Sequence, residues 1–169
     1  MKKVITILIL GFIILSFGST DSYASSTQLS LDGTQSSWAV NELREAYSFN
    51  LTYPTIMNNY KRDITREEFS TIAVKLYEAL TGKKAIYSSN PFRDTRNTEV
   101  LKAYNLGIVN GKSSTEFKPL DRITRQEISV MLYRTLNVSI SNLDKNISGT
   151  FPFRDQNNIA SWAMDAMRF

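Results

Sequence analysis

Two arginines occur in the same short phrase at two places in the chain. The phrase ITREE at residues 64–68 returns, with one change, as ITRQE at residues 123–127. At the start of a helix, Arg66 and Arg125 would lie beside free backbone amides, and such a pair of donors is a good seat for a carboxylate or phosphate. The pattern therefore predicts anion binding at both arginines. The alternative is a solvent-exposed charge or a salt bridge to a neighbouring unit, and the residue types alone leave both interpretations open.

The threonine and the last glutamate of each phrase indicate where a helix begins. Thr65 with Glu68, and Thr124 with Glu127, fit the Thr-x-x-Glu capping box, in which each side chain bonds to the backbone amide of the other residue. A cap of this kind stabilises a helix by about 1 kcal/mol. Capping does not explain the arginines, because the positive end of the helix dipole disfavours a cation by roughly a few tenths of a kcal/mol.

The residue types exclude most other chemistry. The chain contains no histidine and no cysteine, so it has no Ser-His-Asp or Cys-His arrangement, no thiolate nucleophile and no zinc site with histidine ligands. Paired carboxylates can hydrolyse sugars, but no pair stands apart from the charges expected on helix surfaces. We therefore expect no catalytic residue, no cofactor and no metal, and a protein that is not an enzyme.

The first 24 residues have the pattern of a signal peptide. Lys2 and Lys3 precede an apolar run at residues 4–17, and a small-x-small site ends at Ala24. We expect export and cleavage after Ala24. The alternative is an uncleaved membrane anchor, since the apolar run is near the lower length limit of a transmembrane helix.

The charge of the exported chain favours an anionic partner. Removing Lys2, Lys3 and Asp21 from 20 basic and 16 acidic residues leaves a net charge of +3. The chain lacks the dense Lys/Arg runs of a nucleic-acid binder, so no nucleic acid is expected as a partner. Without disulfides, stability must come from a hydrophobic core, for which about 145 residues suffice.

The chain repeats itself after about 60 residues. Besides the two phrases, NPFRD at residues 90–94 returns as FPFRD at residues 151–155, and Trp38-Ala39 is matched by Trp162-Ala163. The third copy stops before any third phrase, so we expect it to be truncated. The predicted divisions are a signal peptide (1–24), an exposed N-terminal segment (25–35), a first unit (36–82), a second unit (90–138) and the start of a third unit (151–169).

Each full unit is predicted to contain two helices around a structured loop. The apolar residues after each phrase recur with helical spacing. In the second unit the first helix ends at LGIVNG, where Gly107 suits a left-handed residue and Ile108 can fold back on the last turn. The loop of the first unit lacks this motif, so the sequence does not predict its conformation. The stripe after the first phrase consists of Phe69, Ile72, Ala73, Leu76, Tyr77 and Leu80.

The order of these motifs resembles the S-layer homology domain of bacterial surface proteins. The second unit matches that pattern almost from end to end, the first matches in WAV and ITREE, and the third matches only in its opening half. The resemblance implies a mainly α fold of tandem helix-loop-helix units with a pseudo-threefold arrangement, the third unit being incomplete. It also implies grooves between units that bind anionic secondary cell wall polysaccharide, commonly pyruvylated.

This resemblance supplies an anion for the two arginines. It implies that Arg66 and Arg125 bind a carboxylate of the polymer, with Asn110 and Gly111 bringing backbone amides close to a sugar. For the last two residues simple turn formation is the alternative and the preferred interpretation. Trp162 is expected in the core rather than against a sugar, and Trp38 likewise.

The resemblance implies non-covalent anchoring of an exported protein to the cell wall, and therefore a secreted protein located in the cell wall or S-layer. S-layer proteins or other surface proteins are further candidate partners, and no membrane contact is expected after signal cleavage. The alternative function is an accessory or remnant of a cell-wall-degrading enzyme whose catalytic part is not in this chain.

Overall fold

The computed structural model describes residue 29, residues 31–148 and residues 153–169. The predicted signal peptide and the first residues of the predicted third unit lie outside this part of the chain. Within it the protein is mainly helical and has no strand, so the mainly α prediction is confirmed. None of these described helices has the length and apolar composition needed to cross a bilayer. The helices are α2 (Val40–Ser48), α3 (Arg66–Thr81), α4 (Thr98–Asn105), α5 (Arg125–Ser139) and α6 (Met164–Arg168), with 3-10 turns η1 (Ser37–Ala39), η2 (Pro54–Ile56), η3 (Gln156–Asn158) and η4 (Ser161–Ala163).

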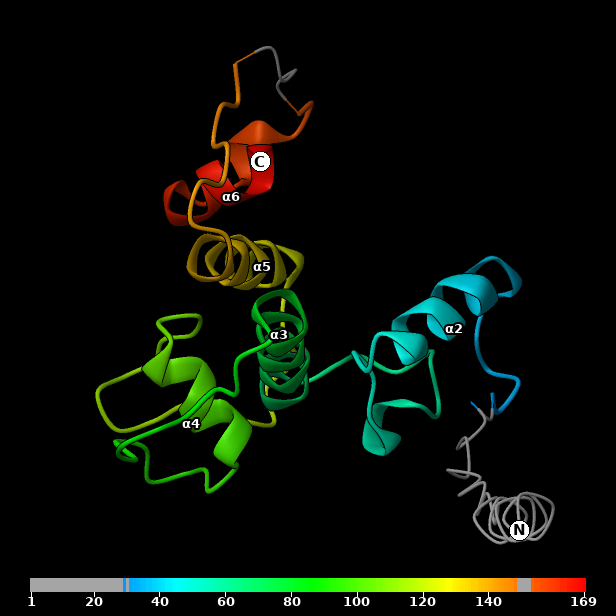
Figure 1. The fold of residues 1–169 in the computed structure, drawn as a ribbon. Helices are drawn as coiled ribbons and strands as arrows, with labels where there is room; N and C mark the ends of the chain where they lie inside the picture. The colour runs from blue at the N-terminus through cyan, green and yellow to red at the C-terminus, as the bar shows by residue number, and fades with distance from the viewer. Residues whose placement is uncertain (1–28, 30, 149–152) are drawn as a thin grey trace, which may run out of the picture.

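The helices are arranged as a series of neighbours (Figure 1). α3 lies in the middle and packs against both α4 and α5, and α6 packs on α5. α2 lies to one side, and a hollow lined by Leu43 of α2 and Ile72 of α3 separates the two helices. α4 thus covers α3, and α6 packs on α5.

The core lies between α3, α4 and the loop that follows α4. Phe92 and Phe117 lie at its centre with their ring centroids 5.4 Å apart, and Tyr104 meets Phe92 edge to face at 5.0 Å. Aromatic side chains dominate core energetics because each buries a large apolar area. The remaining buried apolar side chains of this cluster are Phe69, Ala73, Val74, Ala85, Val100, Leu101, Ala103, Ile108, Val109 and Met131.

α4 ends with the turn that the sequence predicts. Gly107 adopts a φ of 72°. The amides of Gly107 and Ile108 donate to the carbonyls of Tyr104 and Ala103, each at 2.9 Å, which is the Schellman arrangement. Ile108 is fully buried, so this turn also directs an apolar side chain into the core.

α2 ends with the same turn although it has no glycine. Asn50 adopts a φ of 56°, which asparagine tolerates better than most residues because its short polar side chain bonds locally. The amides of Asn50 and Leu51 donate to the carbonyls of Tyr47 and Ala46, each at 2.9 Å. The loop whose shape the sequence leaves open therefore begins like its counterpart in the second unit.

Both phrases begin a helix with a capping box. The Thr65 hydroxyl accepts a hydrogen bond from the Glu68 amide at 3.3 Å, and the Glu68 carboxylate accepts one from the Thr65 amide at 2.9 Å. The corresponding distances between Thr124 and Glu127 are 3.2 and 3.0 Å. α3 and α5 accordingly begin directly after these threonines.

An aspartate braces the loop before each phrase. Asp94 accepts a hydrogen bond from the Lys118 amide at 2.8 Å, and Asp32 accepts one from the Asn59 amide at 2.5 Å. Lys118 and Asn59 have φ values of 60° and 47°, and each stands six residues before its capping threonine. The segment 25–35, expected to precede the first unit as an exposed stretch, therefore includes a residue that binds to that unit.

Candidate functional site

The start of α3 is covered by the loop of the second unit. The amide of Arg66 donates to the carbonyl of Asp121 at 2.9 Å, and the amide of Glu67 donates to the carbonyl of Pro119 at 3.1 Å. These are two of the amides that the helix itself leaves without partners. The expectation of free amides beside Arg66 is therefore wrong for α3, because a segment about 55 residues further along the chain supplies the acceptors.

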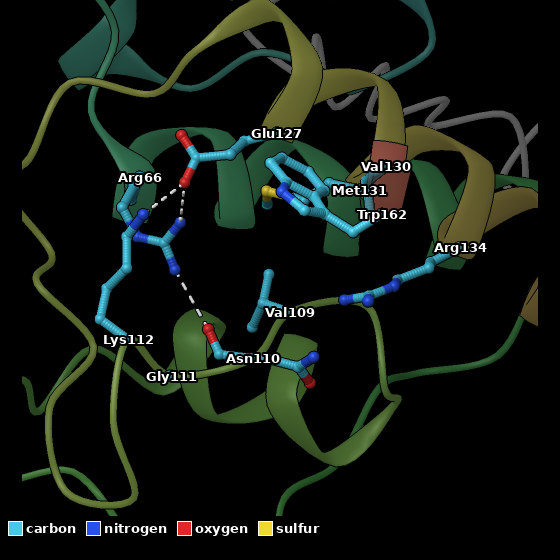
Figure 2. Close-up of a pocket in the computed structure, with 10 residues that line it drawn as sticks. All are labelled: Arg66, Val109, Asn110, Gly111, Lys112, Glu127, Val130, Met131, Arg134 and Trp162. Atoms are coloured by element: carbon cyan, nitrogen blue, oxygen red, sulfur yellow. Dashed lines mark hydrogen bonds and ion pairs between the residues drawn. The ribbon is translucent and has the colours of Figure 1, made fainter. Parts of the chain in front are cut away.

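The side chain of Arg66 is also engaged within the protein (Figure 2). Its Nε donates to the carbonyl of Phe117 at 3.2 Å, and its terminal nitrogens donate to the carboxylate of Glu127 at 3.0 Å and the carbonyl of Asn110 at 3.1 Å. The guanidinium carbon lies 4.8 Å from the centroid of the Phe117 ring. Because only 6% of Arg66 is exposed, its first role in this structure is to join the two units.

The carboxylate of Glu127 forms salt bridges with two cations. Besides Arg66, the Lys112 ammonium donates to the same carboxylate at 2.6 Å. Burial raises the pKa of Glu127, but hydrogen bonds from Lys112 and Thr124 outweigh burial and lower the pKa to about 2. The carboxylate is therefore ionised throughout the physiological range and neutralises much of the charge of its two partners.

The equivalent glutamate of the first unit, Glu68, is bound by an arginine of its own unit. Glu68 accepts hydrogen bonds from both terminal nitrogens of Arg62, at 2.6 and 2.9 Å. The hydrogen bond with Arg62 lowers the pKa of Glu68 more than burial raises it. At the position of Arg62 the second unit has Asp121, six residues before the glutamate in each case, so Glu127 depends on an arginine from the preceding unit.

A hollow of about 260 Å³ opens beside the Arg66–Glu127 pair (Figure 2). We call it the α3–α5 groove. Its walls come from α3, from the loop after α4, from one face of α5 and from η4. The residues that line it are Arg66, Val109, Asn110, Gly111, Lys112, Glu127, Val130, Met131, Arg134 and Trp162.

Three side chains of the groove are free to meet a ligand. The guanidinium of Arg134 extends along the groove beneath Trp162 (Figure 2) and makes no hydrogen bond or ion pair with another described residue. Trp162 is 60% exposed. Asn110 is exposed and uses only its backbone carbonyl in binding Arg66. An unpaired forked cation, an open indole and a side-chain amide thus line one cavity.

The expectation that both tryptophans belong to the core is wrong. Trp38 is 76% exposed and Trp162 is 60% exposed. Each lies in a short 3-10 turn before a helix, η1 or η4, and the alanine after Trp162, Ala163, is the residue buried against α5. The residue of this turn that packs into the interior is therefore Ala163 and not Trp162.

Gly111 has a packing role in the groove. A Cβ atom at this position would lie 2.3 Å from the Ser113 carbonyl oxygen and 2.7 Å from the Phe92 ring. Such contacts are far inside van der Waals distance, so the loop can approach the core only with glycine here. This agrees with turn formation as the preferred interpretation of Gly111.

Arg125 has surroundings different from those of Arg66. It is exposed and lines another hollow, of about 230 Å³, together with Gln126, Phe153 and Asp155. Its guanidinium has no hydrogen bond or ion pair within the part of the chain that the structure describes, and neither do the backbone amides of Arg125 and Gln126. The structure therefore brings Arg66, Asn110 and Gly111 together and places Arg125 elsewhere.

The junction after α5 repeats one detail of the junction after α3. The Gln126 side chain donates to the carbonyl of Asn158 at 3.0 Å and accepts from the amide of Ala160 at 3.0 Å. Glu67, the residue equivalent to Gln126, accepts a hydrogen bond from the Asn97 side chain at 3.4 Å. The second residue of each helix thus holds the start of the following unit.

Arg134 and Lys112 line the groove but carry no motif in the sequence. Arg134 lies seven residues after Glu127, on the helix face that also carries Val130 and Met131. A lone cation in an otherwise apolar stripe was the available signal. Among the described residues no three acidic side chains lie close enough together to hold a metal ion.

Comparison with known proteins gives the class of this domain. Residues 91–128 match the model of the S-layer homology domain, and this segment contains α4, the braced loop and the start of α5. The chain therefore carries an S-layer homology domain, a module that binds polysaccharide of the cell wall and attaches proteins to the cell surface.

Three curated proteins are similar to this chain. An endoglucanase from Bacillus sp. (strain KSM-635) is 26% identical over 170 residues, which cover 98% of this chain and 18% of the endoglucanase. The exoglucanase XynX of Acetivibrio thermocellus is 33% identical and the amylopullulanase of Thermoanaerobacterium thermosulfurigenes 32% identical, each over 110 residues and 60% of this chain. The matches cover 10% and 6% of these two proteins, so the chain spans less than a fifth of the length of its relatives. No solved structure matches the chain.

Proposed function

We propose that this chain anchors an exported protein to the cell wall by binding an anionic secondary cell wall polysaccharide, with the α3–α5 groove as the main site. The observation that carries this proposal is that one cavity holds both the exposed ring of Trp162 and the Arg134 guanidinium, which has no partner among the described residues. A sugar ring stacks on the indole, while the guanidinium forms a two-pronged contact with a carboxylate such as that of a pyruvate ketal.

Arg66 contributes to this site through the groove wall. It holds the carbonyl of Asn110 and the carboxylate of Glu127, so it fixes the loop that presents the Asn110 side chain to a sugar hydroxyl. Gly111 lets the same loop lie against the core. In the proposed site Arg134 contacts the carboxylate directly, and Arg66 positions residues that contact the sugar.

Arg125 is proposed as a second, weaker anion contact in the hollow beside the third unit. Its guanidinium and the amides of Arg125 and Gln126 have no partner among the described residues, and this supports the role. Asp155 lines the same hollow and opposes an anion there. The tandem arrangement with pseudo-threefold symmetry is part of the same proposal, and the repeated contacts of Glu67 and Gln126 with the following unit support it.

The test is calorimetric titration of a purified, pyruvylated wall polysaccharide fragment into the protein. Arg134→Ala is expected to weaken binding about ten- to a hundredfold, the range for a hydrogen bond to a charged group. Trp162→Ala is expected to weaken it about tenfold through lost stacking. Arg96→Ala is the matched control, because Arg96 is exposed and does not line the groove. Unchanged affinity in the Arg134→Ala, Trp162→Ala double variant would exclude this groove as the site.

The enzyme relatives favour a second candidate function. The three similar proteins are an endoglucanase, an exoglucanase and an amylopullulanase, so the chain is alternatively the accessory part of a longer wall-degrading enzyme. Incubation with peptidoglycan and with wall polysaccharide separates the two functions. An anchor co-sediments with the wall and releases nothing, whereas a released reducing end would establish catalysis by this chain.

A further inference from the structure

Asn110 and Gly111 form the only Asn-Gly step in the sequence, and both residues line the α3–α5 groove (Figure 2). The backbone nitrogen that follows an asparagine can attack the asparagine side chain. Glycine favours this attack because it has no side chain to obstruct the approach and the widest choice of backbone conformations. Gly111 cannot be exchanged for another residue, because a Cβ atom there would lie 2.7 Å from the Phe92 ring. Packing therefore retains a reactive step in the groove.

The attacking nitrogen and its target are both accessible. Asn110 is exposed, and the amide of Gly111 makes no hydrogen bond within the described part of the chain. Asn105, at the end of α4, is also exposed. However, the amide that follows it, that of Leu106, donates to the carbonyl of Lys102 at 2.9 Å. A hydrogen bond that holds the proton of an amide keeps its nitrogen from attacking, so two exposed asparagines of one segment differ in reactivity.

Arg66 polarises the peptide group that joins Asn110 to Gly111. A terminal nitrogen of Arg66 donates to the carbonyl oxygen of Asn110 at 3.1 Å, and that carbonyl belongs to the same peptide group as the Gly111 nitrogen. The amide must lose its proton to attack, and the negative charge then spreads to the carbonyl oxygen. A cation already bound at that oxygen stabilises the charge, as the donors of an oxyanion hole do.

We propose that Asn110 is a self-modification site, whose deamidation weakens the groove for anions as the protein ages. The Gly111 nitrogen forms a bond to Cγ of Asn110 and gives up its proton. The side-chain nitrogen leaves with that proton as ammonia, and a cyclic imide remains. Water then adds to one carbonyl of the imide and breaks its bond to nitrogen, which leaves either aspartate or isoaspartate. The only co-reactant is water, and nothing is oxidised or reduced.

Both products add a negative charge to the groove. The charge appears in the cavity that holds Arg134 and Trp162, where the proposed function places the carboxylate of the polymer, so this consequence rests on that function. Isoaspartate also routes the main chain through the former side chain, and the carbonyl that Arg66 binds is then no longer part of the backbone. The modification therefore acts on the charge of the groove and on the loop that forms its wall.

Mass spectrometry of the folded chain, incubated at neutral and at mildly alkaline pH, tests the modification. Trypsin releases residues 103–112 as one peptide, which contains both Asn110 and its internal control Asn105. The expected result is replacement of the amide by an acid at Asn110 alone, faster at the higher pH, with isoaspartate among the products. Asn110→Gln should abolish the change, because its longer side chain closes a larger ring. If Asn110 stays intact in the folded chain but converts in a synthetic 103–112 peptide, the inference is wrong.

Titration of the pyruvylated wall fragment tests the consequence. Asn110→Asp reproduces one product, and Asn110→Ser removes the amide without adding a charge. The aspartate variant is expected to bind about five- to tenfold more weakly than the serine variant, the size of one exposed charge contact. Equal affinities of the two variants would overturn the effect on the groove. A wild type that does not bind the fragment would instead refute the proposed function, and the mass measurement would still decide whether Asn110 is modified.

Discussion

The two copies of the ITR phrase differ in what lies over the helix start. At α3 the loop of the second unit supplies carbonyls to the amides of Arg66 and Glu67, and the Arg66 side chain reaches three acceptors in that unit. At α5 the amides of Arg125 and Gln126 are open, and the Arg125 side chain has no partner in the described part of the chain. Nearly the same five residues therefore form a contact between two units at the start of α3, which we call the joint, and an exposed helix start at α5.

The phrase therefore has a local and a non-local role. The local role is the cap, which both copies perform because Thr and Glu lie within one helical turn. The non-local role belongs to the arginine and depends on a neighbour that offers carbonyl and carboxylate acceptors. Three measurements test whether the two copies differ in this way.

The largest effect is expected from removing the joint. Arg66→Ala leaves the buried carbonyl of Phe117 and the partly buried carbonyl of Asn110 without their donor and takes one cation from Glu127, so the free energy of unfolding should fall by about 3 kcal/mol. Arg125→Ala should change it by less than about 0.5 kcal/mol, as for an ordinary surface substitution. Urea unfolding of both variants measures the difference, and equal effects would show that the two arginines have the same surroundings.

A smaller effect is expected from acid. The folded-state pKa of Glu127 is lowered to about 2 from an ordinary value of 4.5. A lowered pKa stabilises the folded state above the unfolded value and loses that stability as the pH falls toward the folded value. Stability should therefore decline between pH 4.5 and about 2. Allowing for solvent screening, the loss is about 1–2 kcal/mol.

The variant Glu127→Gln gives the control for the acid experiment. It keeps an oxygen that can accept from the Thr124 amide but has no charge to titrate. Thermal unfolding as a function of pH should then show a flatter profile for the variant than for the wild type. If the two profiles run in parallel below pH 4.5, the carboxylate at this joint is not the group that titrates.

The smallest effect is expected from the caps. Thr65→Ala and Thr124→Ala each remove one hydroxyl acceptor, which costs about 1 kcal/mol in each case. Both helices have the same capping box, so the two losses should agree within about 0.5 kcal/mol. Circular dichroism during thermal unfolding measures them. A much larger loss at Thr65 would mean that its hydroxyl also supports the joint to the second unit.

The parts of the fold that the sequence predicted are those encoded within a few residues. The capping threonines and the left-handed Gly107 each act inside one or two helical turns, and all are found in the structure. Asn50 ends α2 in the same way as Gly107 ends α4. Because asparagine tolerates the left-handed region, Asn50 indicated the end of this helix even though no glycine follows it.

The parts of the site that the sequence did not reveal depend on contacts between units. Whether Arg66 is free or bound is decided by the carbonyls of residues 110–121, and no local pattern encodes that approach. Trp162 looked like a core residue because its segment is apolar, yet the 3-10 turn directs Ala163 toward α5 instead. Arg134 was missed because a single cation in a helix resembles ordinary surface charge.

The ion pair between Arg62 and Glu68 bears on the order in which the units can form along the chain. Glu68 obtains its guanidinium from its own unit, whereas Glu127 obtains one from the unit before it. A chain that emerges amino end first can therefore complete the ion pair of the first unit before the second unit has appeared. The second unit then closes onto an arginine that is already held at the start of a capped helix. Assembly in this order leaves neither glutamate waiting for a residue that is still to be synthesised.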